Sequence, residues 1–242
     1  MKKHLLKLST FASLPLLSLA AISCSNKQNI PPRDYEMVNV ETNGLAFNSE
    51  GVITKFYNFG GSTDINLVIP EYLINNRVLT SEYYGYKQRI TSIGNMVFSA
   101  QTEYDIASGQ YKPIYNEYAQ YLNSITLPNS IETIGGDAFR ETPLTEIILP
   151  ESIITIGDSA FRYCTNLTSI TLLSKKIKYI GINAFYYSSN LKGELFIPDS
   201  IVSIGSGAFY GTQISKVSVP NRNVYVSDSF PEGCEIIIRD EL

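Results

Sequence analysis

Five glycines stand at a fixed place in a recurring stretch of this sequence. They are Gly94, Gly135, Gly157, Gly181 and Gly205, and each follows an isoleucine and precedes a phenylalanine by four residues. Those phenylalanines are Phe98, Phe139, Phe161, Phe185 and Phe209. A glycine loop can hold a phosphate, but such a loop needs a glycine cluster, a following lysine and a helix, and the stretch has none of these. We therefore interpret both sets as structural.

Residue types that carry out catalysis are scarce. His4 is the single histidine and belongs to the N-terminal signal segment, so the mature chain lacks Ser-His-Asp and Cys-His catalysis and histidine-ligated metals. Acids occur at most once per expected strand or turn, as at Glu146, Asp158, Glu194 and Asp228. This spacing indicates neither a catalytic carboxylate pair nor an aspartate ladder for calcium. We predict no enzymatic activity, no metal and no cofactor.

Residues 1–23 have the features of a bacterial secretory signal. A cationic start precedes the apolar stretch 11–22, which is too short to span a bilayer, and small residues precede Cys24. This order resembles the lipobox of bacterial lipoproteins, which implies cleavage before Cys24 and a lipid on its thiol. An ordinary signal followed by a chance cysteine is the alternative. Losing three lysines changes the net charge from −4 to −7, so the lipid would hold the chain at the membrane.

From residue 122 the sequence is an array of similar segments. They cover 122–143, 144–166, 167–190 and 191–213, with a diverged last copy at 214–238. Repeats of 22 to 24 residues are too short for paired helices and fall in the leucine-rich range. Ile147 and Leu149 lie on one face of a strand, Pro150 ends the strand, and Gly157 permits a turn that a side chain would obstruct. One coil buries a single face, so coils must stack.

The repeat resembles the BspA-like, or Treponema-type, leucine-rich repeats. Leu144, Ile147, Leu149 and Pro150 match the strand part of that signature, and Ser152 to Phe161 with Cys164 match the rest. The resemblance covers roughly residues 67–230. It implies a mainly β, right-handed leucine-rich-repeat solenoid with a parallel sheet, short turns or 3-10 segments on the convex side, and an N-terminal β-hairpin cap.

The expected organisation has four parts. Residues 1–23 form the signal, 24–36 a tether, 37–64 the capping hairpin, and 65–242 the repeats, with insertions at 80–89 and 99–121. Phe98 and Phe139 are 41 positions apart, so a decayed coil could lie between them. Cys164 takes the place of a core cysteine in the family pattern. About three rungs, or roughly 14 Å, separate it from Cys234, which disfavours a disulfide unless the carboxyl end is kinked.

Two sets of residues are candidates for binding. Alternation along the strands turns one set outward, and its notable members are Val68, Glu146, Ile148, Glu194 and Phe196. Exposed apolar residues on a sheet can anchor a partner, although strand propensity alone also explains them. The second set is tyrosines of the 99–121 insertion, Tyr104, Tyr111, Tyr115 and Tyr118. These tyrosines either bind a partner or cover the edge of the first coils. If they do not pack against the coils, deleting residues 100–119 should leave the melting temperature of the protein nearly unaltered.

These observations favour a membrane-anchored surface lipoprotein that binds proteins. The resemblance implies adhesion to a protein ligand such as a host surface or matrix protein. A structural surface-coat or assembly protein and a lipoprotein that captures sugar or peptide nutrients are the alternatives. An acidic chain without a basic patch makes nucleic acid an unsuitable partner.

The anchor gives a direct prediction. Cys24→Ala should release the protein into the medium, because the cysteine would carry the lipid. Fractionation of cells into membrane and medium measures this. A protein that stays in the membrane fraction would show that the lipobox interpretation is wrong.

Overall fold

The computed structural model describes residues 37–39, 45–48, 50–57, 62–74, 87–105, 110–113 and 116–241. The chain divides into two compact units, Met1–Ile30 and Pro31–Leu242, and all described residues belong to the second. The predicted signal, its Cys24 and the tether lie outside the described residues, as do 80–86 of the first insertion.

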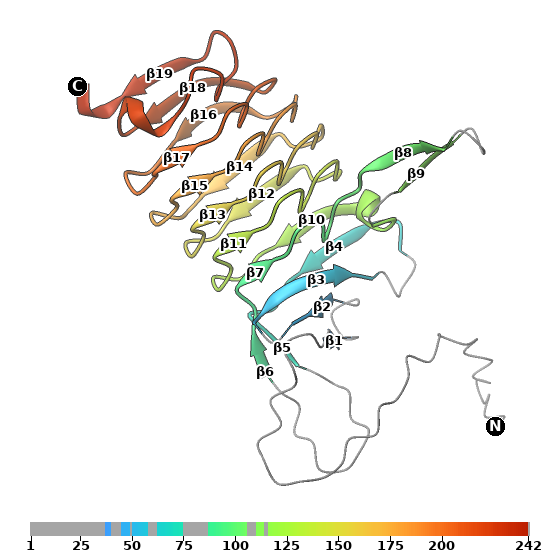
Figure 1. Ribbon diagram of the computed structural model, residues 1–242. Coiled ribbons are helices and arrows are strands. Elements are labelled where there is room, and N and C mark those ends of the chain that lie inside the picture. The colour runs from blue at the N-terminus through green and yellow to red at the C-terminus, as the bar shows by residue number, and fades with distance from the viewer. Residues whose placement is uncertain are drawn as a thin grey trace, which may run out of the picture. The chain divides into compact units, whose positions relative to one another are not determined.

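The described chain winds as a stack of coils, and five of them have one long strand and one strand of two residues (Figure 1). The long strands are β4 (Ile65–Val68), β10 (Leu122–Thr126), β12 (Glu146–Leu149), β14 (Ser169–Leu172), β16 (Lys192–Phe196), β18 (Gln213–Val219) and β19 (Glu235–Ile238). The short strands are β7 (Ser92–Ile93), β11 (Thr133–Ile134), β13 (Thr155–Ile156), β15 (Tyr179–Ile180) and β17 (Ser203–Ile204). The described part contains no α-helix, so the mainly β solenoid expected from the repeats is confirmed.

The short strands form one continuous sheet. Its order is β1-β2-β3-β7-β11-β13-β15-β17, and from β3 onward the pairs are parallel. In every coil the isoleucine before the glycine takes the same register, so Ile134 lies between Ile93 and Ile156. These isoleucines are buried, and their alignment makes one layer of the core.

The long strands fall into three smaller sheets: β10-β4, β12-β14 and β16-β18-β19. All three pair in parallel, and buried residues alternate regularly with exposed ones in β4 and β12; in β12, Ile147 and Leu149 point inward. Two irregularities occur in these pairings, at Leu122/Ser124 and at Gly193/Glu194.

An antiparallel cap begins the stack. β1 (Met37–Asn39), β2 (Leu45–Phe47) and β3 (Val52–Phe56) pair in order, and β3 then pairs in parallel with β7. The turn between β2 and β3 is held by Asn48, whose side-chain oxygen accepts from the backbone N–H of Glu50 and Val52, both at 3.0 Å. Gly51 takes a left-handed conformation there, with φ of 78°.

A column of phenylalanine rings runs through the core. Phe98, Phe139, Phe161, Phe185 and Phe209 are buried, and successive rings stack with centroids 5.0 to 5.1 Å apart. Phe230 extends the column at 5.6 Å, which shows that the diverged last copy still completes a coil. Each phenylalanine N–H also donates to the next coil, as Phe161 does to the Ala184 carbonyl at 2.7 Å.

The repeated glycines mark the closest approach between coils. A Cβ on Gly157 would lie 2.7 Å from the carbonyl carbon of Gly135, closer than real Cβ contacts. The Gly157 N–H meanwhile donates to the Ile134 carbonyl at 2.8 Å. A side chain at the glycine would therefore be obstructed, as expected from the sequence. The turn itself lies two positions after each glycine, at residues with a left-handed backbone such as Asp137, Ser159 and Asn183, whose φ is 51° to 57°.

The long gap between the first two phenylalanines adds no rung to the stack. Phe98 stacks directly on Phe139 and β7 pairs with β11, so these two coils are neighbours, and the decay of a coil within the gap stays a prediction. The intervening chain instead forms the antiparallel pair β8 (Thr102–Asp105) and β9 (Gln110–Pro113), then the 3-10 turn η1 (Ala119–Tyr121). The first insertion ends in β6 (Lys87–Arg89), which pairs with β5 (Tyr72–Ile74) from the chain before the insertion. Two further 3-10 turns, η2 (Arg222–Val224) and η3 (Arg239–Glu241), lie near the carboxyl end.

The glycine ladder predicts a sharp difference between adjacent positions. Gly157→Ala should lower the free energy of unfolding by about 2 to 3 kcal/mol, because two backbones must separate to admit the methyl group. Gly136→Ala is the matched control: its Cβ would meet nothing closer than 3.4 Å, and its φ is not left-handed. Urea unfolding measures both changes. Equal losses at the two positions would contradict the close-approach explanation.

Candidate functional site

The outward face of the long strands presents two columns of side chains, placed as the alternation predicts. The first column is Asn66, Ser124, Glu146, Ser169, Glu194 and Lys216, and the second is Val68, Thr126, Ile148, Thr171, Phe196 and Ser218. The strand registers align the pairs within each sheet. All twelve side chains are exposed or half-buried.

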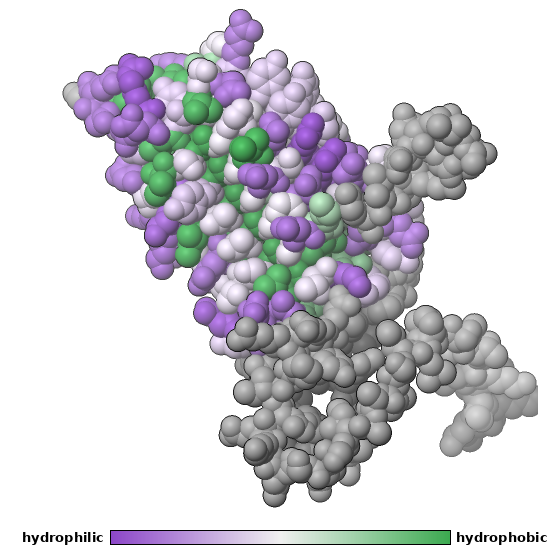
Figure 2. Space-filling view, in the orientation of Figure 1, coloured by the Kyte–Doolittle hydropathy of each residue, from purple (hydrophilic) through white to green (hydrophobic). Residues whose placement is uncertain are grey.

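The apolar members of the second column are well separated. Val68, Ile148 and Phe196 are 63%, 53% and 60% exposed, and hydroxyl-bearing residues lie between them. With a rung spacing of about 4.8 Å, successive apolar side chains stand about 10 Å apart. The face turned to the viewer in Figure 2 likewise shows hydrophobic and hydrophilic side chains interspersed over the strands. Such a surface offers discrete anchors rather than a continuous apolar strip.

The acidic members do not form a catalytic pair. Glu146 and Glu194 belong to β12 and β16, with β14 between them along the chain, so about two rungs separate their carboxylates. Lys216 lies beside Glu194 in register and its Nζ is 3.8 Å from Glu235. Among the described residues no group of three acids, cysteines or histidines could hold a metal ion.

The Phe196 anchor has a neighbour that the repeat pattern does not reveal. The Arg239 guanidinium lies 4.3 Å from the centroid of the Phe196 ring and donates to Ser218 Oγ at 3.0 Å and to the Ile197 carbonyl at 2.7 Å. The same guanidinium pairs with Asp199 at 2.5 Å. Phe196 is thus held in place from one side while most of its surface stays accessible.

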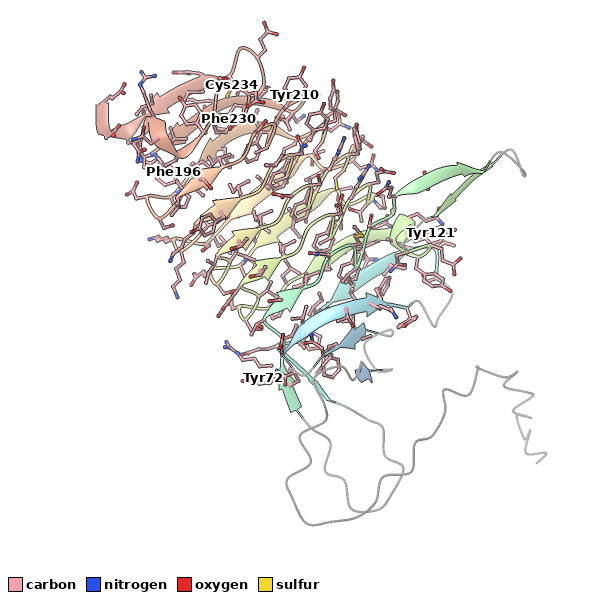
Figure 3. All side chains as sticks on the ribbon, in the orientation of Figure 1. Tyr72, Tyr121, Phe196, Tyr210, Phe230 and Cys234 are labelled. Carbon is pink, nitrogen blue, oxygen red and sulfur yellow. The ribbon has the colours of Figure 1, made fainter. Side chains whose placement is uncertain are left out.

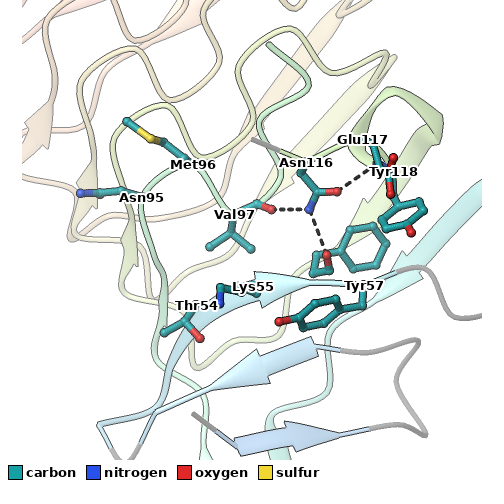
Figure 4. Close-up of a pocket in the computed structure, with 10 residues that line it drawn as sticks. Thr54, Lys55, Tyr57, Asn95, Met96, Val97, Asn116, Glu117 and Tyr118 are labelled. Carbon is teal, nitrogen blue, oxygen red and sulfur yellow. Dashed lines mark hydrogen bonds between the residues drawn. The ribbon is translucent and has the colours of Figure 1, made fainter. Parts of the chain in front are cut away.

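A pocket of about 650 Å³ lies at the amino-terminal end of the stack (Figure 4). Its lining comes from three segments: the end of β3, the turn of the first coil, and the start of η1. The lining residues are Thr54, Lys55, Phe56, Tyr57, Asn95, Met96, Val97, Asn116, Glu117 and Tyr118.

Asn116 joins these three segments. Its buried amide nitrogen donates to the Phe56 carbonyl at 3.1 Å and to the Val97 carbonyl at 2.8 Å. Its side-chain oxygen accepts from the Tyr118 N–H at 3.0 Å. The amide therefore has its hydrogen-bonding capacity committed to the protein, and it stabilises the pocket wall instead of being available to a ligand.

The insertion tyrosines have different positions. The backbone of Tyr104 in β8 lies opposite that of Tyr111 in β9, and Tyr115 lies outside the described residues. Tyr118 is half-buried against the core, and a hydrogen bond with Glu117, then burial, raises its pKa. Ala119 beside it is fully buried. Of the four tyrosines, Tyr118 is the one whose side chain the structure describes, and it lies at the edge of the first coils.

Sequence reasoning missed a second cluster of tyrosines. Tyr163, Tyr186, Tyr187 and Tyr210 come one or two residues after the ladder phenylalanines, and their rings contact one another across three coils. Figure 3 shows Tyr210 and Phe196 on opposite sides of the stack, so this cluster is distinct from the long-strand face. Counting tyrosines by their position in the repeat, rather than by local density, would have found it.

The cysteines of the repeats are free. Cys164 is fully buried, its thiol donates to the Phe139 carbonyl at 3.0 Å, and burial raises its pKa to about 12. Its thiolate is therefore scarce at neutral pH. Cys234 is half-buried, and burial also raises its pKa. No helix in the described part of the chain is long and apolar enough to cross a membrane.

Comparison with known proteins agrees with this architecture. Residues 114–237, slightly more than half of the chain, match the family model of the BspA type leucine rich repeat region in six copies. No curated protein matches the chain.

Several solved structures have a similar fold. The leucine-rich repeat protein of T. pallidum is 22% identical with a TM-score of 0.51, and the match covers 70% of this chain and 63% of that one. A leucine rich cell surface protein of Faecalibacterium prausnitzii is 21% identical with a TM-score of 0.47, over 76% of this chain and 42% of that one. The chain therefore spans less than two thirds of the length of either protein.

The pocket wall leads to a prediction about the insertion. Asn116→Ala should lower the free energy of unfolding by about 2 kcal/mol, because two buried carbonyls lose their donor. Replacing residues 103–112 of the β8–β9 pair with a short glycine-serine loop should leave it nearly unchanged. Thermal and urea unfolding test both variants. A stable Asn116→Ala protein would show that the segment does not depend on this amide, and the earlier expectation that all of 100–119 can be removed would regain support.

Proposed function

Since this chain belongs to the BspA type leucine-rich repeat family, we propose that it is a protein-binding module displayed on the surface of a bacterial cell. Leucine-rich repeat folds of this type are generally non-enzymatic. The Faecalibacterium relative is described as a cell surface protein, which supports the same location for this chain.

The observation that carries the proposal is the row of exposed apolar side chains on the long-strand face. Val68, Ile148 and Phe196 remain at least half exposed although a polar residue would serve solubility better there. Binding energy at protein interfaces is concentrated in a few such anchors surrounded by polar contacts. Hydroxyl-bearing residues between the anchors suit this arrangement, because their hydrogen bonds to water can be replaced by hydrogen bonds to polar groups of a partner.

The chemistry of the face describes its partner. Anchors about 10 Å apart fit separate apolar side chains of a folded protein. Glu146 and Glu194 in the adjacent column are exposed carboxylates that would pair with basic residues beside those side chains. A basic and apolar surface on a host surface or matrix protein is therefore the proposed ligand, and the activity is adhesion.

The anchor and the domain limits belong to the same proposal. A lipid on Cys24 would hold the mature chain at the outer face of the cell membrane, and residues 24–36 would act as the tether. The sequence of charge, apolar run, small residues and cysteine supports this. Residues 37–64 would cap the repeats of 65–242, and β1, β2 and β3 at the end of the short-strand sheet support that limit.

The proposal predicts the effect of removing two anchors. The variant Ile148→Ser with Phe196→Ser should lose at least tenfold in affinity for its protein ligand while keeping its melting temperature. Val202→Ser is the matched control, because Val202 is 53% exposed but lies outside the long strands. Biolayer interferometry against a panel of immobilised matrix and cell-surface proteins measures the affinities. Equal binding by all three proteins would remove the long-strand face as the adhesive surface, and no binding to any panel member would favour a surface-coat role.

A further inference from the structure

The tyrosine cluster after the phenylalanine column forms a compact aromatic surface. The Tyr186 and Tyr210 rings stack at 5.5 Å, and Tyr187 meets both edge-on at 4.7 and 5.7 Å. Tyr163 joins from the preceding coil at 6.0 Å. Tyr187 and Tyr210 are each 42% exposed, so ring edges and hydroxyls face solvent. We call these four residues with Arg162 the tyrosine ridge.

Arg162 is the charged centre of the tyrosine ridge. Its guanidinium lies 4.9 Å from the Tyr163 ring centroid and 5.1 Å from that of Tyr186. It makes one long hydrogen bond, to the Tyr163 hydroxyl at 3.4 Å, and its Nε is buried without a hydrogen-bond partner. Among the described residues no carboxylate pairs with it. A guanidinium in this state has donors available for an anion.

The preceding coil shows that this is a property of Arg162 and not of the column. Arg140 holds the same position one coil earlier, directly after Phe139. There Asp137 and Glu141 both pair with the guanidinium, each at 3.3 Å. The charge of Arg140 is thus neutralised within the protein, whereas that of Arg162 is not.

The sequence that follows Arg162 also lacks acidic residues. Residues 159–193 contain no aspartate or glutamate, although the whole chain has 23 acids and a net charge of −4. The same stretch carries five basic residues: Arg162, Lys175, Lys176, Lys178 and Lys192. This stretch therefore carries five positive charges and no negative one within a chain that is acidic as a whole, although Glu146, Glu151 and Asp158 precede it in the third coil.

The backbone of the tyrosine ridge disfavours an extended peptide. Tyr163 N–H donates to the Tyr186 carbonyl at 2.9 Å, and Tyr187 N–H to the Tyr210 carbonyl at 2.8 Å. An added strand needs unpaired backbone groups, and these are already paired between coils. Recognition must therefore use side chains: aromatic rings, phenol hydroxyls and a guanidinium. The neighbouring Tyr210 and Tyr186 raise the pKa of Tyr187, which keeps its hydroxyl neutral and able to donate.

We propose that the tyrosine ridge binds an acidic sugar, a pyranose that carries a carboxylate. The planar carboxylate would accept hydrogen bonds from the Arg162 guanidinium, whose fork geometry matches it. The apolar face of the pyranose would pack on the exposed rims of Tyr187 and Tyr210, with their hydroxyls bonding those of the sugar. This site lies apart from the long-strand face and does not depend on the adhesive role of that face.

Fluorescence anisotropy with labelled oligosaccharides tests the proposal on the chain from residue 25 onward. The probes are trigalacturonic acid and sialyllactose, and their neutral counterparts are the trimethyl ester and lactose. Both acidic probes should bind at least tenfold more tightly than their counterparts. Binding of one acidic probe alone would still support the site and would identify the sugar, whereas equal binding of acidic and neutral sugars, or no binding of any, would overturn the proposal.

Matched arginine variants locate the site. Arg162→Gln should reduce affinity for the acidic probe at least tenfold. Arg222→Gln is the control and should leave the affinity unchanged, because Arg222 pairs with Glu241 near the carboxyl end. Arg162→Lys keeps the charge and should retain part of the affinity, so it distinguishes loss of binding from loss of folding if Arg162→Gln unfolds at a lower temperature. Equal losses in the Arg162 and Arg222 variants would overturn the assignment. A labelled glutamate-rich peptide that binds as tightly as the acidic sugar would also overturn it, in favour of a peptide site.

Discussion

The structure depends on how closely successive coils approach one another at the repeated glycine. At Gly157 the gap to the preceding coil leaves no room for a Cβ, and the N–H reaches the Ile134 carbonyl at 2.8 Å. This contact sets the coil spacing, and the spacing in turn brings the phenylalanine rings to about 5 Å. The buried rings then fill the core as one column, which explains why glycine and phenylalanine recur together.

The short strands hold successive coils together along one side of the stack, so the residues on the other surfaces can vary. The short strands pair in an unbroken series, whereas the long strands separate into three sheets with two irregular registers. Outward side chains on the long strands take little part in the stacking. Residues there can therefore change at small cost in stability.

Much of the fold can be predicted from the sequence, because equivalent positions in successive repeats contact one another. Ile147 and Leu149 face inward and Ile148 outward, as alternation requires. Contacts between residues distant in the sequence could not be read this way: Arg239 reaches Phe196, and Asn116 joins β3 to the first coil. The unpaired state of Arg162 shows in the sequence only when two copies are aligned: Arg140 has Asp137 and Glu141 beside it, and the same offsets from Arg162 hold Ser159 and Tyr163. The repeat pattern thus specifies the scaffold, and departures from it determine the candidate sites.

Hydrogen–deuterium exchange tests the central role of the close approach most directly. If the stacking at the glycines and phenylalanines holds the coils together, the amides of Gly157, Phe161, Gly181 and Phe185 should exchange slowest and lose protection together in one cooperative step. The β8–β9 pair, which stands outside this stacking, should exchange much faster. Faster exchange at these glycine and phenylalanine amides than in the long strands β12 and β14 would contradict the account, because the long strands would then be the element that holds the stack.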